Sequence, residues 1–199
     1  WNGTLNKYDR ISGEGKSEDV STYKEGKLDG ICIEYYYTDV ASKKHYKNGI
    51  LDGEFKYINW TEYYYDKSWG EKTGTYKNGV LHGKYVETFW YGGISKSCNY
   101  SMGKLDGIYE EYIKIEINNP TETTVYCPVG EEDGPDKRFL YARMNYSDGS
   151  LNGKYELFDS LGKVIYETEF VNGTGVLKTF YGFNGIGKTC SEKEYENGK

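Results

Sequence analysis

The chain has 199 residues and a net charge of −6, which allows one or two ordinary domains or one repeat array. Ile, Leu, Val and Phe together number 38, too few for a thick aliphatic core, whereas 23 Tyr and four Trp supply a different apolar surface. Long helices are disfavoured by 26 Gly and two Ala. The mixed charges form no basic stripe for nucleic acid or an anionic membrane, and no apolar run is long enough to span a bilayer as a helix.

One short phrase recurs along the chain. It reads YKEGKLDG at 23–30, YKNGILDG at 46–53 and YKNGVLHG at 76–83, with looser copies at 100–107 and 146–153. With fainter copies included, the first glycine of each phrase gives nine markers: Gly3, Gly26, Gly49, Gly79, Gly103, Gly130, Gly149, Gly173 and Gly198. Their spacing predicts a single continuous array of about eight repeats of roughly 24 residues over 1–199.

Each repeat is predicted to contain two strands and two turns. Asn or Asp precedes many of the glycines, as in Asn48-Gly49 and Asp52-Gly53, and these dipeptides favour left-handed turns and tight hairpins. Aromatic stretches of alternating polarity, such as 85–89, are typical of strands. A second break is expected within the repeats at Gly13, 39–42, Gly92-Gly93, 118–120, Gly162 and Gly185. The expected fold class is all-β, an elongated antiparallel β-hairpin array of about sixteen strands.

Two segments depart from the repeat. The segment 57–75 is longer than its counterparts, and 118–138 fits the phrase poorly. Six aromatic residues lie in or beside the extra length: Tyr57, Trp60, Tyr63, Tyr64, Tyr65 and Trp69. Three consecutive tyrosines cannot all face one side of a strand, and exposed Tyr and Trp are favoured in binding surfaces. These six are the predicted partner-binding residues; the alternative is that they cover a thin hydrophobic layer.

The phrase Tyr-x-Asn-Gly-x-Leu-x-Gly, followed by aromatic residues, resembles the bacterial variant of the MORN repeat (membrane occupation and recognition nexus). Chains of this kind are often labelled antitoxin-component repeat proteins. The resemblance covers nearly the whole chain and is strongest at 23–112 and 146–199. It implies an antiparallel β-hairpin array that binds proteins or, in some members, lipids, and it brings no catalytic residue. The excess of 22 Lys over 3 Arg is typical of an AT-rich bacterial genome.

Other short motifs are not expected to form chemical sites. The stretch 182–189 matches the phosphate-binding pattern GxxxxGK[ST], but only ten residues follow it and they return to the repeat phrase, so a turn is expected. His45 and His82 have no sequence partner for a triad or a metal site and are expected to be surface or turn residues. The four cysteines form no CxxC pair, which disfavours structural zinc and leaves disulfides and free thiols open: Cys32, Cys98, Cys127 and Cys190.

The sequence therefore predicts a non-enzymatic scaffold that binds another protein and needs no cofactor or metal, since no nucleophile stands beside a base. One alternative is a glycan or cell-wall binding module at the cell surface, although Trp is not periodic as in such modules. A second is a cytoplasmic antitoxin that neutralises a toxin. The chain begins at Trp1 rather than Met, which fits a processed or excised product. A secreted, periplasmic or cell-surface location is expected, with the cytoplasm as the alternative.

Overall fold

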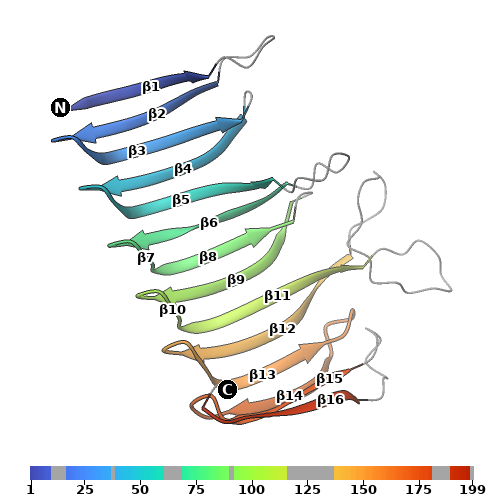
Figure 1. Ribbon diagram of the computed structural model, residues 1–199. Coiled ribbons are helices and arrows are strands. Elements are labelled where there is room, and N and C mark those ends of the chain that lie inside the picture. The colour runs from blue at the N-terminus through green and yellow to red at the C-terminus, as the bar shows by residue number, and fades with distance from the viewer. Residues whose placement is uncertain are drawn as a thin grey trace. The chain divides into compact units, whose positions relative to one another are not determined.

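The computed structural model describes residues 1–9, 17–36, 39–60, 69–89, 92–115, 137–180 and 189–197, and every element in them is a β-strand (Figure 1). The chain clusters into two compact units. Unit 1 is Trp1–Gly93 with Tyr100–Gly103, and unit 2 is Ile94–Asn99 with Lys104–Lys199. The paired strands within each unit are antiparallel, which confirms the predicted all-β hairpin architecture. In this described part of the chain there is no helix that could cross a membrane.

Unit 1 is a sheet with the strand order β1-β2-β3-β4-β5-β6-β8, and β7 pairs with β6 (Figure 1). The strands are β1 (Gly3–Asp9), β2 (Ser17–Lys24), β3 (Lys27–Tyr36), β4 (Asp39–Lys47), β5 (Ile50–Trp60), β6 (Trp69–Lys77), β7 (Val80–Leu81) and β8 (Gly83–Thr88).

Unit 2 contains a sheet with the order β9-β11-β12-β13-β14 and a separate two-stranded sheet of β15 and β16. The strands are β9 (Ile94–Ser101), whose first part belongs to unit 2, β10 (Lys104–Leu105), β11 (Gly107–Ile115), β12 (Lys137–Ser147), β13 (Ser150–Phe158), β14 (Val164–Phe170), β15 (Gly175–Phe180) and β16 (Thr189–Tyr195).

The marker glycines form two-residue hairpin turns. In six described turns both central residues have positive φ, 47–52° at the first and 76–87° at the glycine. Type I′ turns require this conformation, and they match the twist of the flanking strands. The six turns are Glu25-Gly26, Asn48-Gly49, Asn78-Gly79, Met102-Gly103, Asp148-Gly149 and Asn172-Gly173. The sequence prediction of tight hairpins at these dipeptides is confirmed.

Each turn is also tied to the repeat before it. The amide of Gly49 donates to the carbonyl of Leu28 at 2.7 Å, and the amide of Asn48 donates to the Asp29 carboxylate at 3.0 Å. The same pair of bonds recurs one repeat later, where Gly79 and Asn78 donate to Leu51 and Asp52 at 2.8 and 3.0 Å. The Leu-Asp part of the phrase therefore caps the next turn. The second dipeptide, Asp-Gly, does not form a hairpin of its own, which corrects the sequence interpretation.

The second glycine lies in a register shift. Tyr46 pairs with Leu51 and Lys44 with Phe55, so His45 on β4 faces the three residues 52–54 on β5. Gly53 has a φ of +121°, and a Cβ built there would lie 2.9 Å from the Cβ of His45. A β-bulge of this kind bends the strand and leaves no room for a side chain at the glycine.

Gly3 is not a turn marker, contrary to the sequence prediction. It pairs with Tyr23 within the β1–β2 ladder, as Gly53 pairs with Tyr76. The carbonyl of Trp1 accepts the amide of Gly26 at 2.9 Å, which is the role that leucine carbonyls have in later repeats. Trp1-Asn2-Gly3 is therefore equivalent to Leu-Asp-Gly.

The expected mid-repeat breaks have mixed outcomes. Gly92-Gly93 and Gly162 do lie in turns, where the amide of Gly162 donates to the carbonyl of Asp159 at 3.0 Å. The break expected at 39–42 is wrong, because β4 begins at Asp39 and these residues pair with β3. The expected breaks at Gly13, 118–120 and Gly185, the markers Gly130 and Gly198, and most of 118–138 lie outside the described residues.

The buried core of each unit is built largely from aromatic rings. In unit 1, Phe55 and Tyr85 are buried, with ring centroids 6.3 Å apart, and Phe55 also packs on Tyr76 at 4.8 Å. In unit 2, Phe170 is almost completely buried and packs on Tyr155 at 6.3 Å. Neighbouring strands thus bury one another's rings, as repeat arrays require.

Candidate protein-binding surface

The enlarged segment begins as a regular extension of the β5–β6 hairpin. Backbone pairing runs from Gly53 with Tyr76 to Trp60 with Trp69 and has no register shift. The two tryptophans are therefore direct backbone partners at the far end of the described hairpin. Residues 61–68, which include Tyr63, Tyr64 and Tyr65, lie outside the described residues, as do the side chains of Trp60 and Trp69.

Tyr57 is the predicted site residue whose side chain is described. It is half-buried and pairs across the strands with Ser42. Its ring centroid lies 5.1 Å from that of Phe55, and the ammonium nitrogen of Lys44 lies 5.2 Å from the Tyr57 centroid, within cation–π range. Because alternate residues of a strand share a face, Tyr57 lies on the same face as the marker aromatic Tyr46.

We call this surface of unit 1 the aromatic face, defined by Tyr46, Phe55, Tyr57, Tyr76 and Tyr85. Tyr46, Tyr57 and Tyr76 are half-buried, so part of each ring remains accessible to solvent. Burial raises the pKa of Tyr46 and Tyr57, despite the nearby ammonium group of Lys44. These phenols are therefore neutral around physiological pH and offer apolar surface together with a hydroxyl.

A polar cluster that the sequence reasoning missed interrupts the aromatic face. Ser42 is only 4% exposed, and its hydroxyl donates to the carboxylate of Glu34. Lys44 donates to the same carboxylate oxygen at 3.0 Å, and the lysine side chain is 15% exposed whereas that of Glu34 is 49% exposed. The alternation of side chains along β4 could have predicted this cluster, because Ser42 and Lys44 lie four and two residues before Tyr46 and must share its face.

Glu34 and Lys44 both stay ionised around neutral pH, because the pKa of the acid is lowered and that of the base is raised. The hydrogen bond from Ser42 lowers the pKa of Glu34; burial opposes this shift, and Lys44 reinforces it. Burial disfavours the charged form of Lys44, but the hydrogen bond and charge of Glu34 outweigh it and raise the lysine pKa. A general base needs a pKa near the working pH, and a nucleophilic serine needs a basic partner. The cluster is therefore better suited to binding a charged or polar group through its ionised side chains than to transferring a proton.

The two histidines have backbone partners. The Nδ1 atom of His45 lies 2.8 Å from the carbonyl oxygen of Glu54. His82 Nδ1 accepts the amide of Met102 at 3.4 Å, so His82 stands where Asp29 and Asp52 cap other turns. His82 therefore caps a turn in place of the aspartate of the other repeats.

The remaining sequence motifs are only partly described. Cys32 and Cys98 are buried free thiols, whereas Cys127 and the side chain of Cys190 lie outside the described residues. Most of the GxxxxGK[ST] pattern at 182–189 also lies outside them. No group of three or more His, Cys, Asp or Glu side chains within the described ranges is placed to hold a metal ion.

Comparison with known proteins assigns no function to this chain, so the aromatic face is the main guide to function. No model of a known protein family matches this chain, and no curated protein matches it either.

Proposed function

We propose that this protein is a non-enzymatic repeat scaffold of the MORN-variant type that binds another protein through the aromatic face and the adjoining β5–β6 hairpin. The observation that carries the proposal is the combination around Tyr57. Half-buried aromatic rings adjoin an ion pair whose lysine side chain is mostly buried and whose carboxylate remains half exposed. Protein interfaces favour aromatic anchors beside a few oriented charges.

The placement of Glu34 supports recognition of a partner. Its carboxylate already accepts bonds from Ser42 and Lys44, so its position is fixed before any partner arrives. A preorganised carboxylate loses little side-chain entropy on binding and still has accessible acceptor positions. A backbone amide or a basic side chain of a partner protein is the group that such an acceptor selects.

The β5–β6 hairpin that adjoins the aromatic face is the second part of the proposed binding surface. Trp60 and Trp69 lie three backbone pairs beyond Tyr57 and Lys72 along the β5–β6 ladder. Segments that change length without disturbing the register are where binding differences accumulate. The hairpin therefore continues past Tyr57 and carries aromatic residues that the repeat itself does not require.

Photo-crosslinking tests this proposal. We would replace Tyr57 with p-benzoylphenylalanine and, as the control, place the same residue at the exposed position Lys163 in unit 2. A protein captured from source cells at position 57 and not at 163 would then be purified and its affinity measured by calorimetry. Capture of a glycan without a protein would replace this function by the glycan-binding alternative.

The variants Trp60→Ala and Trp69→Ala distinguish binding from packing. Truncating an aromatic anchor costs about 2 kcal/mol of binding free energy, so affinity for the captured protein should fall roughly thirtyfold. Tyr85→Ala is the matched control, because Tyr85 is buried in the ladder and its loss should lower the melting temperature. If both Trp variants bind normally and melt early, the hairpin is a packing element and the binding surface is wrongly assigned.

A further inference from the structure

The opposite face of unit 1 gathers lysines into a shallow groove. Its lining comes from β4, β5, β6 and β8 and includes Lys43, His45, Lys56 and Lys84, with Glu54 as the acidic member. An adjoining hollow shares Lys43 and Lys56 and adds Asp39. We call these residues the lysine groove. The two hollows together are lined by three lysines and two acids, in a protein whose net charge is −6.

The centre of the lysine groove is a like-charge pair. Lys43 and Lys56 are direct partners across the β4–β5 ladder. Like charges at directly opposed positions of an antiparallel pair destabilise the sheet. Lys56 forms an ion pair with Glu71 on its other side, whereas exposed Lys43 has no acidic partner within the described residues. The fold itself gains nothing from the charge of Lys43.

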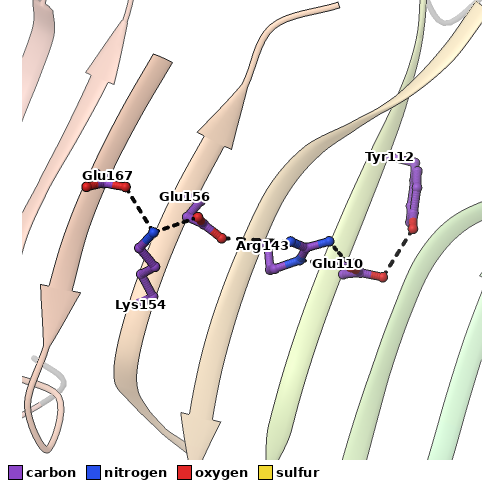
Figure 2. Close-up of polar contacts among 6 residues, drawn as sticks. All are labelled: Glu110, Tyr112, Arg143, Lys154, Glu156 and Glu167. Carbon is purple, nitrogen blue, oxygen red and sulfur yellow. Dashed lines mark hydrogen bonds and ion pairs between the residues drawn. The ribbon is translucent and has the colours of Figure 1, made fainter. Parts of the chain in front are cut away.

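Unit 2 shows how the same kind of pair is neutralised when the protein supplies the counter-charge. Glu156 and Glu167 are directly opposed across β13 and β14, but the Lys154 ammonium lies 2.9 and 3.0 Å from their carboxylates (Figure 2). Arg143 in turn lies between Glu156 and Glu110, with the Glu110 contact at 2.9 Å (Figure 2). Each like-charge pair in this network has a cation or an anion between its members.

We propose that the lysine groove binds an acidic, extended peptide segment whose carboxylates supply the counter-charge missing at Lys43. This inference rests on the proposed function, since it gives the chemistry of a second contact with a protein partner. Neighbouring strands lie about 4.8 Å apart, so Lys43 on β4 and Lys84 on β8 are separated by roughly 14 Å in the direction across the strands. An extended peptide rises about 3.3 Å per residue, so four or five residues with two or three carboxylates span the groove.

The composition of the groove favours a peptide over a phosphate polymer. Glu54 and Asp39 interrupt the positive charge, and hydroxyl groups of Thr73 and Thr75 line the same groove. A peptide backbone can satisfy such neutral groups and avoid the two acids, whereas a phosphate backbone with uniform charge would be repelled by them.

The test uses fluorescently labelled hexaglutamate and the full chain, with binding followed by anisotropy at low salt. The charge-reversal variant Lys43→Glu/Lys84→Glu should weaken binding at least tenfold. The control Lys163→Glu/Lys193→Glu makes the same change in net charge at exposed positions of unit 2 and should leave binding unchanged. The variant Lys43→Arg/Lys84→Arg keeps both positive charges and should bind hexaglutamate as the original chain does. Equal losses in the two charge-reversal variants would show an unspecific effect of net charge and overturn the inference.

Two further readouts keep the inference separate from the proposed function. Lys43→Glu alone should raise the melting temperature, because it converts the opposed lysines into an ion pair; a lower melting temperature would refute the like-charge argument. A hexanucleotide of single-stranded DNA that binds the groove more tightly than hexaglutamate would replace the peptide by a phosphate polymer. If hexaglutamate does not bind but the protein captured at position 57 still does, this inference fails and the proposed function stands.

Discussion

The substitution Gly53→Ala tests whether the second glycine of the phrase is required by a close approach between strands. Gly53 has a φ of +121°, and a Cβ there would lie 2.9 Å from the Cβ of His45 and 3.3 Å from its Cγ. Real Cβ atoms do not approach so closely, and the Cβ of His45 cannot move without its strand. The strands β4 and β5 must therefore separate locally to admit the methyl group.

The expected cost combines two contributions. A non-glycine residue in an unfavourable positive-φ conformation costs about 1–3 kcal/mol, and overpacking adds about 1–3 kcal/mol. Gly83→Ala is the matched control, since Gly83 has a φ of +84° and no atom within 4 Å of the added Cβ. It should lose about 1–2 kcal/mol, the backbone contribution alone. Gly53→Ala should thus destabilise unit 1 by about 2 kcal/mol more than Gly83→Ala.

Urea denaturation followed by circular dichroism measures both losses, and a double-mutant cycle isolates the contact. In a His45→Gly background the nearest atoms are gone, so Gly53→Ala should cost about 2 kcal/mol less than in the original chain. Hydrogen exchange of the β4 and β5 amides locates the effect. Equal costs for Gly53→Ala in the two backgrounds, or equal costs for Gly53→Ala and Gly83→Ala, would refute the close-approach argument.

Two further predictions concern the turns and the buried phenols. Met102 occupies the first position of a type I′ turn with a φ of +47°; Met102→Asn should raise stability by about 0.5–1 kcal/mol in thermal melts, and Asn48→Met should lower it by a similar amount, because asparagine tolerates this conformation best. Burial raises the pKa of Tyr109 to about 12, above its unfolded value near 10. Its neutral form therefore contributes stability that is present below pH 10 and lost as the pH rises towards 12, so Tyr109→Phe should retain more stability at pH 11 than the original chain. Absorbance at 295 nm follows the phenol titration, and an unchanged alkaline transition in the variant would contradict the assignment.

The sequence was sufficient for the hairpins because a type I′ turn depends on two adjacent residues. Asn48-Gly49 and Asn78-Gly79 can adopt positive φ at both positions, and few other dipeptides do so readily. The alternating aromatic stretch at 85–89 likewise predicted β8. Both signals depend only on residues that are neighbours in the sequence, so they can be recognised without knowing which strands pair.

The sequence misplaced features whose meaning depends on a partner strand. The neighbours of Gly3 resemble the phrase and predict a turn marker, but its pairing with Tyr23 gives Gly3 the role of the second glycine. The same limit applies to Asp29 and Asp52, whose carboxylates cap turns 19 and 26 residues further along the chain. Nothing in the residues beside them shows where those amides lie.

The arrangement of charges on the candidate surfaces was decided by the tertiary structure alone. The register shift opposite His45 places two extra residues on β5, and this fixes which later residues of β5 oppose those of β4. Only that register brings Ser42 opposite Tyr57 and Lys43 opposite Lys56. Adjacent residues of one strand point to opposite faces, so charges that are evenly mixed along the chain become separated in space. Composition and spacing predicted an aromatic hairpin array; the pairing of strands determined which charges meet and which are left without a partner.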